Sequence, residues 1–138
     1  MSGYLSVITL VVDDLNRSFE FYNQVFDWPN KGLQGNREDD TQVAFFSPQG
    51  NVKIALWPRE SFNRQLEINS VHSPCMGTTM QSLNVESEAA VEALFDRAMH
   101  AFAESIKPPH WQPWHCYGAY FKDPDGHLWE ITFNPSKA

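Results

Sequence analysis

The sequence predicts an α+β fold built from two copies of one unit, because a strand, a capped helix, a loop and a hairpin follow one another twice. Val12, at the end of the first predicted strand, corresponds to Val85 in the second copy. Pro48-Gln49-Gly50 and Pro124-Asp125-Gly126 are corresponding hairpin turns. The 138 residues are 42% apolar and include ten Phe and five Trp, which is sufficient material for the core of a single domain.

The first copy begins with residues 6–12, which alternate as a strand that places Val7 and Thr9 on the same face. Asp13 or Asp14 can cap the helix that follows. Its apolar stripe has helical spacing and consists of Leu15, Phe19, Tyr22 and Phe26. Residues 30–41 are polar and predict a loop with at most one short strand, and residues 42–47 and 52–57 predict a hairpin.

The second copy follows a polar connection at about residues 59–78, so the two modules are expected at about 1–60 and 78–138. Residues 80–85 predict a strand, and Ser87 is a suitable helix N-cap. The predicted helical stripe consists of Val91, Leu94, Phe95, Ala98 and Phe102. Residues 106–115 are rich in Pro and Trp, which excludes a regular helix there.

Residues 117–135 predict the closing hairpin, with its turn at Asp123-Pro124-Asp125-Gly126. Alternation puts Leu128, Glu130 and Thr132 on one face of the last strand and an apolar set on the other, which should pack on a helix. Glu130 is the single acid among neutral neighbours. Because burying a lone charge is costly, Glu130 is expected either at a hydrated rim or within a functional site.

Residues 120–131, Tyr-Phe-Lys-Asp-Pro-Asp-Gly-His-Leu-Trp-Glu-Ile, resemble the closing hairpin of the vicinal-oxygen-chelate superfamily, and residues 13–22 resemble its first helix. This superfamily includes glyoxalase I, bleomycin-binding proteins, fosfomycin-resistance enzymes and extradiol dioxygenases. The resemblance implies two βαβββ modules that form a curved mixed sheet around a cleft. It also implies a homodimer and, in many members, a divalent metal that is held partly by the acid at the position of Glu130.

The family's metal enzymes take one ligand near the start of the first strand and one from the last strand of each half. Those positions correspond here to Val7, Ile54 (or Leu56 in a shifted register), Met80 and Glu130. Three protein ligands are the usual minimum for a catalytic metal, and only Glu130 is a suitable donor. We therefore expect no metal cofactor, with a divalent metal as the alternative.

His115 could supply a second ligand if the strand before the closing turn extends back to it. Pairing Phe121 with Leu128 would place Ala119 opposite Glu130. His115 lies four residues before Ala119, so on an extended strand both side chains would be on the same face as Glu130. A loop position for His115 is the competing interpretation. Cys116 is expected to be a small buried hydrophobe, and Cys75 and Cys116 do not form a disulfide framework, which favours the cytoplasm.

Ten basic and seventeen acidic residues give a formal charge of −7, which argues against nucleic acid and anionic membranes as partners. No apolar run reaches transmembrane length. A small organic ligand is the expected partner, because aromatic residues and one acid suit a flat or cationic molecule. The candidate ligand-binding residues are Val7, Thr9, Ile54, Met80, Ser82, Trp111, Trp114, His115, Tyr117 and Glu130.

Three functions agree with these observations. The first is a metal-free small-molecule binding protein that is similar to the bleomycin-binding branch. The second is a glyoxalase-like enzyme that uses Glu130 as its catalytic residue, either without a metal or with a divalent metal recruited through His115. The third is a module that serves protein association.

Overall fold

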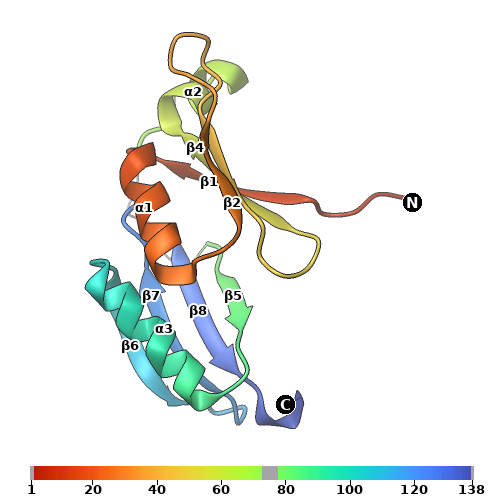
Figure 1. Cartoon of the computed structure of the whole chain (residues 1–138), viewed down its shortest axis with the longest axis vertical. Helices are drawn as coiled ribbons and strands as arrows, with labels where there is room; N and C mark the ends of the chain where they lie inside the picture. Colours follow the sequence, from red (N-terminus) through yellow and green to blue (C-terminus); the bar gives the residue numbers. More distant parts are fainter. Residues whose placement is uncertain (1, 73–77, 138) are drawn as a thin grey trace. The chain divides into compact units, whose positions relative to one another are not determined.

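The computed structural model describes residues 2–72 and 78–137, and the chain divides into two compact units (Figure 1). The first unit comprises residues 1–23 and 27–73, and the second comprises residues 24–26 and 74–138. Cys75 lies outside the described residues. Within the described residues, no helix combines the length and the apolar character needed to cross a membrane.

The first unit is a βαβββ module with a four-stranded mixed sheet in the order β1-β4-β3-β2. Its elements are β1 (Val7–Val12), α1 (Leu15–Phe26), β2 (Asn30–Gln34), β3 (Val43–Phe46) and β4 (Lys53–Pro58). β1 runs parallel to β4, and the other neighbouring pairs are antiparallel. The strand–helix–hairpin order therefore matches the prediction, including one short strand in the polar stretch.

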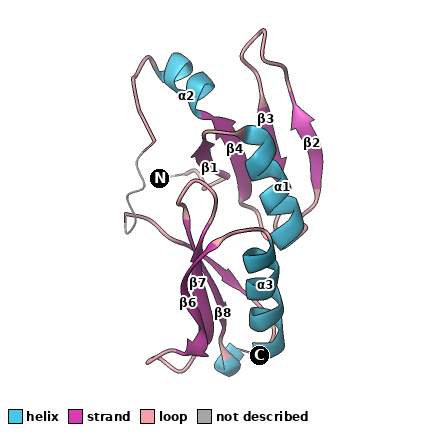
Figure 2. Cartoon of the chain, turned by 90° about the vertical axis from the view of Figure 1, so that its left-hand side faces the viewer, coloured by secondary structure: helices cyan, strands magenta, loops and turns pink. Residues whose placement is uncertain are grey.

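The α1 helix covers one face of the first sheet (Figure 2). The Asp14 side chain caps the helix by accepting a hydrogen bond from the Arg17 backbone N–H. The rings of Phe19 and Tyr22 pack on Phe46 of β3, with centroid distances of 5.6 and 6.0 Å. Helical spacing of the apolar residues thus produces the core of this unit. Phe46 is fully buried as a result.

A helix that the sequence did not predict, α2 (Arg59–Leu66), lies in the polar connection after β4. Glu60 in its first turn and Arg64 in its last turn complement the helix dipole. Glu67 ends the helix in a left-handed conformation. The helix has few apolar residues, so hydrophobic periodicity gave no signal for it.

The second unit repeats the topology of the first, with strand order β5-β8-β7-β6 (Figure 2). Its elements are β5 (Gln81–Asn84), α3 (Glu88–His100), β6 (Glu104–Trp111), β7 (Tyr117–Lys122), β8 (Leu128–Phe133) and the short 3₁₀ helix η1 (Pro135–Lys137). β5 is parallel to β8, as β1 is to β4. The predicted α+β fold of two βαβββ modules is confirmed.

The α3 helix begins as predicted, because the Ser87 hydroxyl accepts a hydrogen bond from the Ala90 N–H at 3.0 Å. The prediction that Phe102 belongs to its buried stripe is wrong. The helix ends at His100, and Phe102 is left-handed with φ 68° and 92% exposed. Backbone bonds from Phe102 to Met99 and from Ala103 to Ala98 close the helix at this point.

Residues 104–111 form β6, in agreement with the prediction that this Pro-rich stretch is not a helix. Proline lacks an N–H donor and is tolerated on edge strands, and β6 is an edge strand of its sheet. The pairing of β6 with β7 shifts register on both sides of Lys107. These irregularities accommodate the two prolines without a regular ladder.

The expected register of the closing hairpin is wrong by one residue. Tyr120, not Ala119, pairs with Glu130, and Phe121 pairs with Trp129. Five residues separate the strands, because the Asp123 carboxylate accepts hydrogen bonds from the Asp125 and His127 N–H groups. The prediction that alternate β8 residues pack on a helix is confirmed, since Trp129 and Ile131 are buried and the Trp129 ring packs on Phe26 at the end of α1, with a centroid distance of 4.8 Å.

Candidate functional site

The open face of the first sheet forms a groove of about 440 Å³. We call it the first-sheet groove; its lining residues are Val7, Thr9, Asp40, Thr41, Gln42, Val43, Phe45, Ala55 and Trp57. Trp57 is held by an edge-to-face contact with Phe62 of α2, at a centroid distance of 5.6 Å. Trp57 therefore forms an aromatic wall of the groove, and its contact with Phe62 fixes the orientation of its ring.

Ile54 does not face this groove. It pairs with Ile8 and Phe46, and Phe46 packs on α1, so Ile54 is buried on the helix side of the sheet together with Leu56. The groove face of β4 presents Ala55 instead, which pairs with Thr9. The alignment with the family pattern predicted Ile54 on the groove face of β4. The observed position differs by one residue, which places Ala55 on the groove face and Ile54 on the helix face.

One end of the groove is formed by a loop that an ion pair holds in place. Arg64 of α2 donates two hydrogen bonds to the Asp40 carboxylate, at 2.6 and 2.9 Å, and the buried Ser61 hydroxyl donates a third at 2.6 Å. These hydrogen bonds, from Arg64 first, lower the pKa of Asp40 to about 2. The loop between β2 and β3 is thereby fixed to α2.

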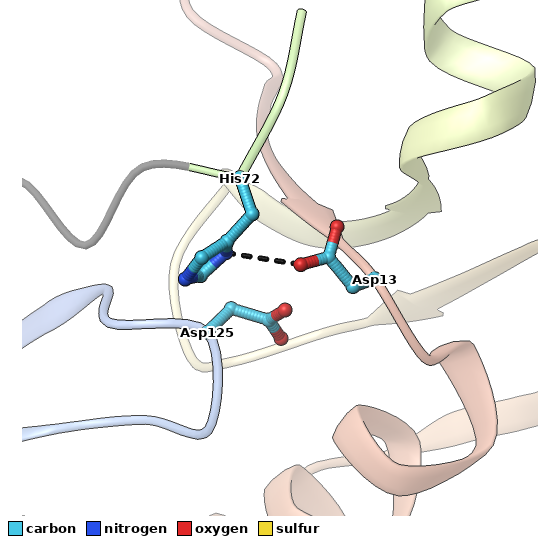
Figure 3. Close-up of side chains that lie close together, drawn as sticks. All are labelled: Asp13, His72 and Asp125. Atoms are coloured by element: carbon cyan, nitrogen blue, oxygen red, sulfur yellow. Dashed lines mark ion pairs between the residues drawn. The ribbon is translucent and has the colours of Figure 1, made fainter.

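A second ionic contact lies at the end of β1 in the same unit. The Asp13 carboxylate accepts a hydrogen bond from Arg59 at 2.8 Å. It also lies 3.0 Å from Nδ1 of His72, the ion pair drawn as a dashed line in Figure 3. Asp125, also drawn in Figure 3, belongs to the β7–β8 turn of the second unit, where its backbone N–H donates to Asp123. The Asp13 contacts tie residues around His72 to β1 and α2.

The second unit carries a buried polar network around Glu130, which is only 8% exposed. The Ser82 hydroxyl donates to Glu130 Oε1 at 2.7 Å, and the Gln112 amide donates to Glu130 Oε2 at 2.8 Å. Gln112 also donates to the Tyr120 hydroxyl and accepts from Thr132. We call these five residues the Glu130 cluster. The network satisfies both oxygens of a carboxylate that could otherwise not be buried.

The sequence analysis did not identify Gln112 as a site residue. In the structure Gln112 is 2% exposed and central to this network. Gly118 of β7 makes room for it, because a Cβ at that position would lie 2.9 Å from Gln112 Nε2. A glycine inside a strand is a known sign of such close approach. That glycine was the available signal, but it could not indicate which residue approaches.

The network also affects the Tyr120 hydroxyl. Burial raises the pKa of Tyr120, and the nearby negative charge of Glu130 raises it further. The phenol is therefore a neutral group at physiological pH. The Tyr120 oxygen accepts a hydrogen bond from Gln112, and a side-chain hydrogen bond to Glu130 also contributes to the raised pKa of Tyr120.

The structure distributes the sequence-predicted site residues over several places. Val7 and Thr9 line the first-sheet groove, and Ser82 binds Glu130. Met80 precedes β5 and is 42% exposed. The remaining candidates, Trp111, Trp114, His115 and Tyr117, gather where β6 turns into β7.

β7 does not extend back to His115, and the competing prediction of a loop position for His115 is confirmed. β7 begins at Tyr117, and His115 is exposed in the preceding turn with a left-handed φ of 68°. The turn is closed by backbone hydrogen bonds between Gln112 and Cys116 and between His115 and Gln112. Cys116 is buried, as expected. His115 is therefore not a strand neighbour of Glu130.

The residues at the family's metal-ligand positions do not fit a divalent metal. Val7 and Ala55 have no donor atoms, and Met80 offers only a thioether, which hard cations do not prefer. Glu130 remains, and both of its oxygens already accept hydrogen bonds from Ser82 and Gln112. These positions thus supply one suitable protein ligand where three are usual.

Comparison with known proteins gives the family. The sequence profile of the Glyoxalase/Bleomycin resistance protein/Dioxygenase superfamily matches residues 4–131, and the chain belongs to this superfamily. The curated protein sequences contain no significant match.

Solved structures share the fold. A glyoxalase-related enzyme from Fulvimarina pelagi is 28% identical with a TM-score of 0.82, over 96% of this chain and 88% of that one. Hypothetical protein SA1046 from S. aureus is 22% identical with a TM-score of 0.75, over 96% and 95%. The fosfomycin resistance protein FosX from Mesorhizobium loti is 18% identical with a TM-score of 0.68, over 99% and 96%.

Proposed function

We propose that this chain is a small-molecule-binding member of the superfamily, and that it holds a flat apolar part of its ligand in the first-sheet groove without a bound metal. The observation that carries this proposal is the open, aromatic-walled face of the first sheet. Its volume of about 440 Å³ lies within the range of ligand pockets, roughly 300–1,000 Å³. The opposite face of the same sheet is filled by the packing of α1 on Phe46.

The chemistry of the lining determines the ligand class. Phe45 and Trp57 offer ring surfaces, and Val7 and Ala55 offer small apolar contacts beside them. Aromatic rings favour offset-stacked or edge-to-face contacts with other rings. The few polar groups at the margin, such as Gln42, can orient a ligand by hydrogen bonding. We therefore infer a ligand with an aromatic body and a polar substituent.

Calorimetric titration with 2-naphthol tests this assignment, with the saturated ring alcohol trans-2-decalinol as the matched non-planar probe. The wild-type protein should bind the planar probe more tightly. Phe45→Ala and Trp57→Ala should each weaken that binding, whereas the exposed Trp114→Ala in the second unit should not. Unchanged binding in both groove variants would overturn the proposal.

The absence of a metal cofactor has its own test. Elemental analysis of untagged protein, purified without chelators and after incubation with Mn²⁺, Co²⁺, Ni²⁺ or Zn²⁺, should give well below one ion per chain. A stoichiometric ion that disappears in Glu130→Ala would overturn this part of the proposal. The homodimer and the cytoplasmic location stay predictions; light scattering and fractionation would test them.

The second candidate is a glyoxalase-like enzyme that uses Glu130. The observation in its favour is that Glu130 is buried with neutral donors, Ser82 and Gln112, on its two oxygens. A carboxylate in such a setting can serve as a general base. Turnover of a family substrate that Glu130→Gln abolishes, with the fold intact by circular dichroism, would establish this function in place of simple binding.

A further inference from the structure

Two aromatic residues at the end of the β6–β7 pair form an open ring surface. Trp111 and Tyr117 are directly opposite each other in the register, and their ring centroids are 5.2 Å apart at an interplanar angle of 57°. Trp111 remains 53% exposed despite this contact. A tryptophan that is held by a neighbouring ring and still presents its surface to water is suited to contact a ligand.

Acidic residues of α3 adjoin this aromatic pair. The Tyr117 hydroxyl donates to Glu92 Oε2 at 3.2 Å, and Glu88 lies one helical turn before Glu92. Burial, followed by the negative charges of Glu92 and Glu88, raises the pKa of Tyr117. Both carboxylates therefore act electrostatically on the Tyr117 hydroxyl. We call Glu88, Glu92, Trp111 and Tyr117 the Trp111 patch.

We propose that the Trp111 patch binds the quaternary or tertiary ammonium group of a small organic molecule. The faces of Trp and Tyr rings carry negative electrostatic potential and attract cations within about 6 Å. The neighbouring carboxylates of Glu88 and Glu92 add attraction over a longer range. An alkylated ammonium has little hydrogen-bonding capacity and is weakly held by water, so it loses little on transfer to a ring face.

A peptide strand is a poorer occupant of this place. β6 is an edge strand, but of the adjacent Pro108 and Pro109 one removes a backbone donor on the open edge that strand addition would use. The register shifts around Lys107 also bend the edge. The assignment is therefore to a small molecule.

This site is separate from the proposed function. All four of its residues belong to the second unit, and none of them lines the first-sheet groove or takes part in the Glu130 cluster. Variants of Phe45 and Trp57 should leave it unaffected. A negative result for ligand binding in the first-sheet groove would therefore not bear on choline binding at the Trp111 patch, and the reverse also holds.

The test is a calorimetric titration of wild type and variants with choline and with its neutral isostere 3,3-dimethylbutan-1-ol. In the wild type, the NMR signal of the Trp111 indole N–H should shift with the same saturation curve. Choline should bind saturably and at least fivefold more tightly than the isostere. Trp111→Ala and Glu92→Gln should each weaken choline binding about two- to fivefold, the range of a cation–π contact at an exposed site. Trp114→Ala, which removes a tryptophan with 60% exposure nearby in the sequence, is the matched control and should not weaken it.

Three results would overturn the proposal: no saturable choline binding, equal affinity for the neutral isostere, or equal losses in Trp111→Ala and Trp114→Ala. Tighter binding of a lysine-rich peptide than of choline would overturn the small-molecule assignment. Trp111→Phe keeps a ring and should retain most of the affinity. Circular dichroism of each variant verifies that the exposed substitutions leave the fold intact.

Discussion

Glu130 accepts a hydrogen bond of 2.8 Å from Gln112, a residue 18 positions earlier that follows directly on β6. This bond links the β6–β7 turn to the middle of β8. Gln112 satisfies its amide oxygen through Thr132 and its second N–H through Tyr120. Gln112 thus satisfies one oxygen of the Glu130 carboxylate, and Ser82 satisfies the other.

Replacing Gln112 by the similarly shaped Met should destabilise the second unit. The change removes the donor to Glu130 Oε2 and the acceptor for Thr132 in a buried place. Leaving buried polar groups unpaired costs about 1–3 kcal/mol each. Urea unfolding at neutral pH should show a loss of this order, whereas Gln34→Met, on the exposed end of β2, should change stability by about 0.5 kcal/mol or less. Equal losses would contradict the role given to Gln112.

Gly118→Ala should also destabilise the protein. The added Cβ would lie 2.9 Å from Gln112 Nε2 and 2.9 Å from the Ile131 carbonyl oxygen, which is closer than Cβ atoms approach. Overpacking of this kind costs about 1–3 kcal/mol.

Combining Gly118→Ala with Gln112→Ala separates the two clashes. The double variant should lose less stability than the sum of the single variants, because one of the two obstructing groups is gone. Full additivity would show that the strain comes from the backbone contact with Ile131 alone.

The repeated strand–helix–hairpin order could be predicted from the sequence because it rests on local signals. Asp14 and Ser87 cap the two helices, and helical spacing places Tyr22 and Leu94 in the cores. These signals act within a few residues along the chain. The short polar helix α2 lacked such a signal.

The candidate site could be predicted only in part, because strand register depends on turn geometry that the residue types leave open. The Asp123 carboxylate lengthens the closing turn by one residue, and this places Tyr120 rather than Ala119 beside Glu130. A shift of one residue likewise places Ala55 rather than Ile54 in the groove. Gln112 reaches Glu130 through tertiary packing alone.

Adjacent phenylalanines on β3 should respond in opposite ways to truncation. Phe46 is fully buried against α1, so Phe46→Ala should cost about 3–5 kcal/mol of stability. Phe45 points into the groove and is half-buried, so Phe45→Ala should cost roughly 1 kcal/mol. Urea unfolding of both variants measures the difference. A larger loss for Phe45→Ala would mean that the two faces of β3 are assigned in reverse.

Asp40→Asn should lower stability at neutral pH and have little effect near pH 2. The pKa of Asp40 falls from 3.8 to about 2 on folding, through hydrogen bonds from Arg64 and Ser61. A lowered pKa means that the charged form stabilises the fold above the unfolded-state value. That contribution is fully present above pH 3.8 and is lost as the pH falls to about 2 and below.

Urea midpoints measured at several pH values provide the readout for Asp40→Asn. The difference between wild type and variant should be constant down to about pH 4 and should disappear over the next two pH units. Arg64→Gln should reproduce this profile, because it removes the same ion pair. Asp96→Asn, at an exposed position of α3, is the control and should show no such step. If Asp40→Asn lowered the stability equally at every pH, the loss would come from altered packing of the loop. The charge of Asp40 would then not be what holds the loop to α2.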